Sequence, residues 1–261
     1  MEMKPDCKAT SGSDGHPDNR QPARIGCAGW SIPRDAGRYF TNHGTHLDRY
    51  ARILNACEIN SSFYRPHKPA TWERWSNSVP AGFKFAVKMS RAITHDSALT
   101  CSSEALAAFH EQVSFLHEKL GALLVQLPPS LEFEHGRTRI FLSRLRDLYD
   151  GDVAWEPRHS SWFSEKADEL LRNFCVARAA ADPPCVPAAA QPGGFAGFAY
   201  FRLHGSPRRY YSAYSEEFMG KIADQISILA SSARVWCVFD NTAAGHAIEN
   251  ALQLAARLRA K

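Results

Sequence analysis

The sequence lacks several features that would assign a protein class at once. The chain has 261 residues and contains no apolar run of roughly 18 residues or more, so no membrane-spanning helix is predicted. The glycines after the first apolar run read GCAGW at 26–30, whereas a dinucleotide-binding turn reads GxGxxG. A GxSxG elbow and a CxxC pair are also absent. These absences argue against a membrane protein, a Rossmann-type enzyme and a serine hydrolase.

Charge and cysteine content set further limits. The net charge is +4 and the pI is about 8.7, which suits an anionic ligand but is far from the strongly basic balance of a non-specific DNA-binding protein. The seven cysteines are odd in number and scattered. Cys27, Cys57, Cys175 and Cys237 fall in or beside predicted strands, where a thiol packs as a small apolar group. This usage predicts a reduced, cytoplasmic compartment.

The first 23 residues differ in composition from the rest of the chain. They are rich in Ser, Gly, Asp and Pro, and they contain no apolar stretch of the kind found in secretory signals. We therefore expect a disordered N-terminal tail at 1–23 and a single folded domain at 24–261.

After the tail, short β-rich runs alternate with longer helical stretches. Strands are predicted at 24–28, 57–63, 83–89, 122–127, 152–156, 175–181, 198–204 and 234–240, and helices near 45–56, 70–78, 103–119, 137–149, 163–173, 216–230 and 244–259. The link at 182–197 is rich in Pro, Ala and Gly and should carry no full helix. This alternation predicts an α/β fold, a single-domain TIM-type (β/α)8 barrel with right-handed crossovers. A doubly wound open sheet is the alternative.

Charged residues interrupt these strands, although parallel barrel strands are usually apolar throughout. If the bulky apolar positions face the helices, the alternate positions point into the barrel. The inward set is then Glu58, Asn60, Ser62, Lys84, Ala86, Lys88, Leu124, Gln126, Ala154, Glu156, Arg158, Arg178, Ala180, Asp182, Tyr200, Arg202, His204 and Asp240. Such a set forms either a structural ion-pair network or a binding floor. We favour structure for Glu58, Lys84 and Arg178, and function at the carboxyl ends of the strands.

The segment 153–162 is the most informative part of the chain. A carboxylate, a guanidinium, an imidazole and an indole follow one another where a strand ends, at Glu156, Arg158, His159 and Trp162. These groups are costly to bury, which favours a ligand site over a core. The alternative is a buried Glu–Arg pair that ends the strand, with Trp155 and Trp162 in the core.

The loop at 204–214 is a second candidate. It offers backbone amides at a Gly-Ser pair, the guanidinium of Arg208 and several tyrosine rings, in the place where barrels of this type often bind phosphate. The last helix begins just after Asn241 and Thr242, so its N-terminal amides should point into the same mouth. An ordinary solvated basic loop is the alternative.

A metal site is a weaker hypothesis. Ligand-type side chains occur near the strand ends at His95, Glu156, His159, Asp182, His204 and Asp240. They form no spacing motif, and the nearby cations would repel a metal ion. We therefore predict no metal ligand, and the sequence names no cofactor.

Several blocks along the chain resemble a known family. They are GCAGWS at 26–31, EINSSFYRP at 58–66, FKFAVKMSRAITHD at 83–96, LGALLVQLPPSLEF at 120–133, WEPRHSSW at 155–162, FAYFRLHG at 198–205 and FDNTAAGHAIENALQL at 239–254. In this order they are similar to domain-of-unknown-function family 72, the YecE-like proteins. The resemblance implies a TIM-type barrel and names no activity. Many relatives have an Asn-Asn-like pair where this chain has Asp240 and Asn241, so Asp240 is not carried over as a site residue.

Two functions are compatible with these residues. The first is a hydrolase-like enzyme acting on a nucleotide, nucleic acid or sugar phosphate, with Glu156 or Asp182 as general base and His159 or His204 as general acid. The expected substrate-binding residues are Trp30, Asn60, Tyr64, Lys88, Gln126, Arg158, Trp162, Arg202, Arg208 and Asn241. The second is a non-catalytic module that binds an anionic metabolite or single-stranded nucleic acid. Neither function involves a membrane.

Overall fold

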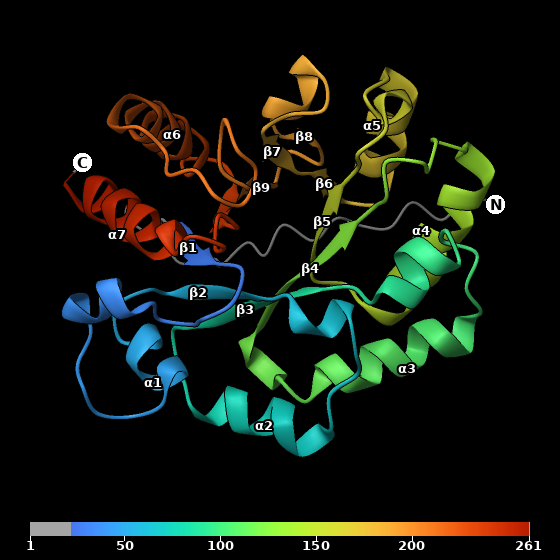
Figure 1. The fold of residues 1–261 in the computed structure, drawn as a ribbon. Helices are drawn as coiled ribbons and strands as arrows, with labels where there is room; N and C mark the ends of the chain where they lie inside the picture. Colours follow the sequence, from blue (N-terminus) through green and yellow to red (C-terminus); the bar gives the residue numbers. More distant parts are fainter. Residues whose placement is uncertain (1–21, 261) are drawn as a thin grey trace, which may run out of the picture.

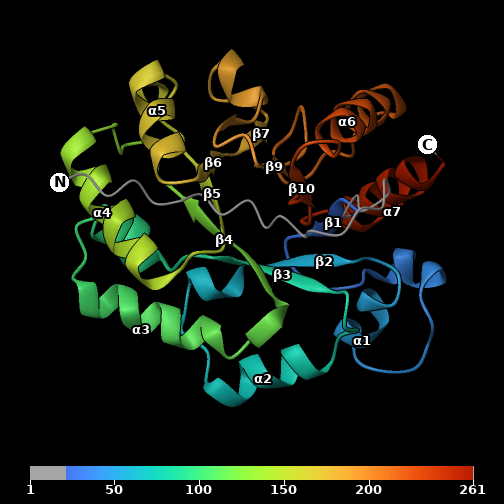
Figure 2. The ribbon, with the colours of Figure 1, turned by 180° about the vertical axis from the view of Figure 1, so that it is seen from behind.

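Short strands alternate with helices along the whole described part of the chain, residues 22–260 of a computed structural model. The strands are β1 (Arg24–Cys27), β2 (Ala56–Ile59), β3 (Lys84–Lys88), β4 (Leu120–Gln126), β5 (Asp152–Glu156), β6 (Val176–Arg178), β7 (Ala180–Asp182), β8 (Gly193–Gly194), β9 (Phe198–Leu203) and β10 (Arg234–Phe239). The α-helices are α1 (His46–Ala51), α2 (Pro69–Asn77), α3 (Ser103–Ser114), α4 (His135–Leu148), α5 (Glu165–Asn173), α6 (Glu216–Leu229) and α7 (His246–Arg259). The protein therefore has an α/β fold, with the helices arranged around the strands (Figures 1 and 2).

The strands pair as two sheets, in the orders β1-β10-β9-β7 and β2-β3-β4-β5-β6-β8. Two junctions join the sheets. At one, β6 and β7 are consecutive parts of one strand that is interrupted only at Ala179. At the other, a parallel bridge links Ala28, just after β1, to Glu58 in β2. The parallel strands thus follow one another around a closed ring, and the short β8 lies antiparallel to β6.

Side chains replace most of the backbone ladder at the β1–β2 junction. The Tyr50 hydroxyl accepts a hydrogen bond from the Cys27 amide at 2.8 Å and donates one to the Ala56 carbonyl at 2.9 Å. The Asn55 side chain accepts from the Ile25 amide at 2.8 Å. Tyr50 and Asn55 together therefore satisfy backbone groups that a regular strand pair would bond directly.

The predicted order of strands and helices is observed. The link after β7 contains only a short 3₁₀ helix at Pro187–Ala190, so the expectation of no full helix there is confirmed. Three predicted elements are subdivided. The sixth strand becomes β6 and β7, the predicted 103–119 helix ends at Ser114, and the predicted 57–63 strand ends at Ile59 and is followed by a 3₁₀ helix at Ser61–Phe63. The predicted disorder of the tail at 1–23 lies, apart from Pro22 and Ala23, outside the described residues.

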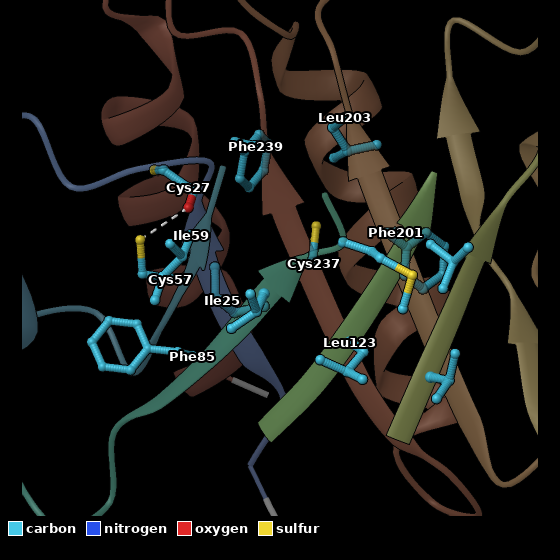
Figure 3. Close-up of a cluster of buried hydrophobic side chains, with 14 of the residues drawn as sticks. Ile25, Cys27, Cys57, Ile59, Phe85, Leu123, Phe201, Leu203, Cys237 and Phe239 are labelled. Atoms are coloured by element: carbon cyan, nitrogen blue, oxygen red, sulfur yellow. Dashed lines mark hydrogen bonds between the residues drawn. The ribbon is translucent and has the colours of Figure 1, made fainter. Parts of the chain in front are cut away.

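An apolar layer lies between the outer face of the ring of strands and the surrounding helices (Figure 3). It includes Cys27, Cys57 and Cys237, which are buried and free, and the Cys57 thiol lies 3.3 Å from the Cys27 carbonyl oxygen. Burial raises the pKa of the Cys57 thiol well above its ordinary value. These three thiols pack as small apolar groups, as predicted. Cys175 is instead disulfide-bonded, so the expectation of a packed thiol is wrong there.

Gly26 marks the close approach of β1 to β2. A Cβ atom at this position would lie 2.0 Å from the Ala56 carbonyl oxygen and 3.0 Å from the Tyr50 hydroxyl. We expect Gly26→Ala to lower the unfolding free energy by about 1–3 kcal/mol, because the backbone of β2 would have to move.

Gly220 in α6 provides the matched control. A Cβ atom there meets nothing within 4 Å, so Gly220→Ala should stabilise the helix by about 0.5–1 kcal/mol. Urea unfolding of both variants measures the two free energies, and an unchanged midpoint for Gly26→Ala would contradict the proposed close packing of this junction.

Candidate functional site

The interior of the ring has an apolar lower layer and a charged upper layer. The lower layer consists of Ala56, Ala86, Ala122, Leu124, Ala154, Ala177, Ala179, Phe198, Tyr200, Trp236 and Val238. Above it, towards the carboxyl ends of the strands, lies a group that we call the central cluster: Glu58, Lys88, Glu156, Arg158, Arg202, His204 and Asp240. The buried charge inside the ring thus lies in the upper layer, towards the carboxyl ends of the strands.

Arg202 is the centre of this cluster. Its guanidinium lies 2.7 Å from Glu58 Oε1, 3.4 Å from Glu156 Oε2 and 3.1 Å from Asp240 Oδ2. The Tyr200 hydroxyl donates a further hydrogen bond to Glu58 at 2.9 Å. Burial alone would lower the pKa of Arg202, but the three carboxylates raise it above its ordinary value. Arg202 is therefore a permanent cation whose donors are occupied by protein carboxylates.

His204 lies between two carboxylates. Its Nδ1 atom is 2.9 Å from Asp240 Oδ2, and its Nε2 atom is 3.0 Å from Glu156 Oε1 and 2.6 Å from Arg158 Nη2. In the neutral ring, Nδ1 donates to Asp240 and Nε2 accepts from Arg158. When Nε2 gains a proton, it donates to Glu156 instead. The site therefore has a partner for His204 in both protonation states, as a proton-transferring group requires.

Glu156 and Arg158 form the pair at the exit of β5. Burial would raise the pKa of the Glu156 carboxyl, but Arg158, Arg202 and His204 together lower it far below the ordinary carboxyl range. Glu156 thus stays ionised and is a poor general base. The Nη2 atom of Arg158 contacts both Glu156 and His204. Its buried Nη1 atom has no hydrogen-bond partner within residues 22–260. An unused buried donor costs free energy, which favours an acceptor supplied by a ligand.

Two amide oxygens near the mouth are also without partners in the described structure. Both the Oδ1 atom of Asn60 and that of Asn241 are buried and accept no hydrogen bond. Asn241 donates through Nδ2 to the Ser212 carbonyl at 3.0 Å and to Asn250 at 2.9 Å, which determines its amide orientation. Asn60 borders an open groove of about 490 Å³ with Ala28 and Trp30. Hydroxyl groups of a ligand are suitable donors for these oxygens.

Several predicted site residues lie outside the central cluster. Trp162 is fully buried, donates through Nε1 to the Leu131 carbonyl at 2.8 Å and packs against Trp155. It belongs to the core, as the alternative interpretation of the 153–162 segment had it. The Nδ1 atom of His159 contacts Ser161 Oγ at 2.9 Å, and its Nε2 faces Glu132. His159 therefore positions the loop after β5 and does not join the acid–base group.

The predicted orientation of the sixth strand is wrong. Ala177 pairs in register with Ala154 of the inner layer, whereas Arg178 pairs with the outward-facing Trp155. Arg178 forms an ion pair with Asp168 of α5 at 2.8 Å, outside the ring. The strand reads VARAAAD, so its two faces do not differ in bulk, and side-chain size could not identify the inner one.

Asp182 follows the same orientation. Its carboxylate accepts a hydrogen bond from the Tyr214 hydroxyl at 2.9 Å and does not reach the central cluster. We therefore no longer assign it the role of general base.

The remaining residues that were predicted to bind a ligand lie outside the central cluster. Trp30 borders the groove, but its ring packs edge-on against Trp75 at 5.0 Å. Tyr64 is 73% exposed, and the amide of Gln126 donates to the Leu127 carbonyl at 2.9 Å. Arg208 is exposed and stacks 4.0 Å from the centre of the Tyr211 ring. Within residues 22–260, none of these four side chains forms a hydrogen bond or an ion pair with the central cluster.

Glu58 and Asp240 are the site residues that sequence reasoning did not select. Strand alternation does place both on the inner face, so their position was predictable. The structural ion-pair role expected for Glu58 is observed, but its partner Arg202 and the contact of Asp240 with His204 could not be predicted, because these contacts join strands that are distant in sequence. Across residues 22–260, no group of three or more His, Cys, Asp or Glu side chains is arranged to hold a metal ion.

The fold and site together define an α/β protein with a buried charged cluster at the carboxyl ends of its parallel strands. Residues 24–261 match the model of a family described as "Protein of unknown function DUF72". The chain belongs to the DUF72 family. The match includes every residue of the central cluster.

Individual relatives support this assignment. The UPF0759 protein YecE of Escherichia coli K12 is 29% identical over 150 residues, which are 57% of this chain and 53% of that protein. The matched part of this chain thus spans about half the length of that curated relative. A DUF72 family protein from Thermotoga maritima MSB8 superposes with a TM-score of 0.75 at 25% identity, over 91% of this chain and 100% of its own. Another, from Enterococcus faecalis V583, gives 0.76 at 22% identity, over 91% and 96%.

No helix within residues 22–260 is long and apolar enough to cross a membrane.

Proposed function

We propose that this protein is a TIM-type (β/α)8 barrel enzyme, hydrolase-like, that acts on a phosphate-bearing small molecule at the carboxyl-end face of its strands. The observation that carries the proposal is the geometry of His204, which lies between Glu156 and Asp240 and beside the unused Nη1 donor of Arg158. An imidazole that has a hydrogen-bond partner in both protonation states is suited to proton transfer.

The roles follow from which groups are still free to bind. Arg202 is saturated by carboxylates, so it positions Glu58 and Asp240 and does not contact the ligand. Arg158 supplies the donor for the anion, since a guanidinium matches the geometry of a phosphate. The Asn60 and Asn241 oxygens would accept hydrogen bonds from ligand hydroxyl groups, which favours a sugar phosphate over inorganic phosphate. His204 would transfer the proton.

A thermal-shift screen tests the anion site. We expect sugar phosphates or nucleotides at a hundred times their dissociation constant to stabilise the protein by about 2.7 kcal/mol, a rise of roughly 5–10 °C in Tm. Arg158→Gln should abolish this shift, because it removes the free donor. The double variant Arg208→Ala/Arg209→Ala is the matched control and should keep the shift, since both arginines are exposed. Loss of the shift only in the double variant would move the site to the rim.

The alternative is a non-catalytic module for an anionic metabolite or single-stranded nucleic acid. Oligonucleotide binding that weakens steeply with salt and is lost in the Arg208/Arg209 double variant would favour it. For a ligand found in the screen, product formation that stops in His204→Asn while binding persists would identify an enzyme. Binding without product in the wild type would identify the alternative.

A further inference from the structure

Lys88 is a buried amine in the central cluster that has no oxygen partner. It is the last residue of β3, and it pairs in register with Leu124 of the inner apolar layer, which places its side chain inside the ring. Lys88 is 6% exposed, and its Nζ atom lies 4.1 Å from the centre of the Phe63 ring. Within residues 22–260 this nitrogen forms neither a hydrogen bond nor an ion pair at salt-bridge distance.

Lys119 shows how the same chain buries a structural lysine. It is 5% exposed, almost the same as Lys88, but its Nζ atom donates to the Pro80 and Ala81 carbonyls at 2.8 and 2.9 Å and lies 3.5 Å from the Glu118 carboxylate. Burial at Lys119 is thus compensated by three oxygen partners. At Lys88 an aromatic ring is the direct neighbour, although carboxylates are present in the same cluster.

The carboxylates near Lys88 are already engaged. Glu58, Glu156 and Asp240 each contact Arg202, and Arg202 is itself a cation that opposes a charge on Lys88. Burial and Arg202 together lower the pKa of the Lys88 ammonium from 10.5 to about 8. At pH 7 about one amine in ten is then unprotonated, compared with about one in three thousand for an ordinary lysine.

We propose that Lys88 is a nucleophile that forms an imine with the carbonyl carbon of a small anionic aldehyde or ketone. A desolvated lysine beside another cation is a recognised way to activate an amine for this chemistry. The proposal rests on the proposed function, because the anionic group of the same molecule would bind Arg158. Lys88 is the last residue of β3 and Arg158 follows the end of β5 in the same sheet, so both cations lie at the carboxyl ends of the strands.

The reaction needs no oxidant, reductant or added cofactor. The Nζ lone pair forms a bond to the carbonyl carbon, and the π electron pair moves to the oxygen. The nitrogen loses a proton and the oxygen gains one, which gives a neutral carbinolamine. The nitrogen lone pair then forms the C=N bond as the hydroxyl group takes up a proton and leaves as water, which gives the protonated imine. His204 is the group in the cluster that could give and take the proton, through its Nε2 atom.

Reductive trapping tests this directly. The wild-type protein is incubated with glycolaldehyde phosphate and sodium cyanoborohydride, which reduces imines to stable secondary amines, and the modified peptide is located by mass spectrometry. We expect one adduct, on Lys88, with the mass of the probe less one oxygen atom. Lys88→Met should lose it, whereas Lys221→Met, which removes a side chain that is 72% exposed, should retain it.

The pH dependence of trapping and the charge of the probe provide two checks that use only the wild-type protein, so they do not require a variant to fold. The trapping rate at Lys88 should rise with pH and reach half its maximum near pH 8, whereas exposed lysines should require a pH above 10. Uncharged glycolaldehyde should react more slowly than its phosphate.

Any of four results would overturn the proposal. The first is an adduct on Lys119 or Lys221 as abundant as that on Lys88. The second is full trapping in Lys88→Met. The third is no adduct although glycolaldehyde phosphate raises Tm, which would reject the imine while leaving the anion site intact. Absence of both adduct and Tm shift would reject the imine and the proposed function together.

Discussion

Arg202→Met is expected to cost about 3–5 kcal/mol of unfolding free energy, among the largest losses for any single substitution in this chain. Arg202 is 2% exposed and is bonded to Glu58, Glu156 and Asp240. Methionine has a similar length but no charge, so the variant leaves three carboxylates close together in the interior. Urea unfolding at pH 7 measures the loss, and the variant should regain part of it at acidic pH, where those carboxylates can take up protons.

Arg178→Met is the control for Arg202→Met. Arg178 is 5% exposed but has a single carboxylate partner, Asp168, whose side chain remains 20% exposed. We expect a clearly smaller loss, because a partly hydrated carboxylate tolerates the removal of its partner. Equal losses in the two variants would show that the central cluster is no more important for stability than an ordinary buried ion pair.

Lys88→Met is expected to act in the opposite direction and to stabilise the protein by about 3 kcal/mol at pH 7. The fall of the Lys88 pKa from 10.5 to about 8 means that the folded state disfavours the ammonium relative to the unfolded state. At about 1.36 kcal/mol for each pKa unit, this cost is fully present below pH 8. Above pH 8 the folded protein loses the proton while the unfolded chain still binds it, so wild-type stability rises until about pH 10.5.

Unfolding curves at pH 7 and pH 10 distinguish this effect from simple packing. The advantage of Lys88→Met should be largest at pH 7 and much smaller at pH 10. Lys119→Met should instead destabilise the protein, because the Pro80 and Ala81 carbonyls would lose their donor. A Lys88→Met variant that is less stable than wild type at pH 7 would mean that the amine has a stabilising partner in solution.

The sequence allowed the fold to be predicted further than the site. Alternation of short strands with amphipathic helices is a local pattern, and it correctly located the elements from β1 to α7. It also predicted the inner positions wherever bulky and small side chains alternate, as at Glu58, Lys88 and Glu156. It was wrong at Arg178 and Asp182, because an alanine-rich strand gives no contrast between its two faces.

The central cluster could be predicted only in part, for a different reason. Glu156, Arg158, Arg202 and His204 were selected because charged groups end apolar strands. Which of them remain free depends on contacts between strands far apart in the chain, such as Arg202 with Glu58 and His204 with Asp240. Trp162 illustrates the same limit, since only the packed structure shows that its indole is enclosed by the core.

Closure of the ring at the β1–β2 junction depends on contacts made by particular side chains. Elsewhere around the ring, neighbouring strands are joined by backbone hydrogen bonds, which many sequences could form. Between β1 and β2 the Tyr50 hydroxyl and the Asn55 amide replace most of that ladder, and the backbones approach closely beside Gly26. The first strand, β1, which pairs on its other edge with the last strand, β10, therefore meets β2 through an internal docking site whose specificity comes from a few side chains.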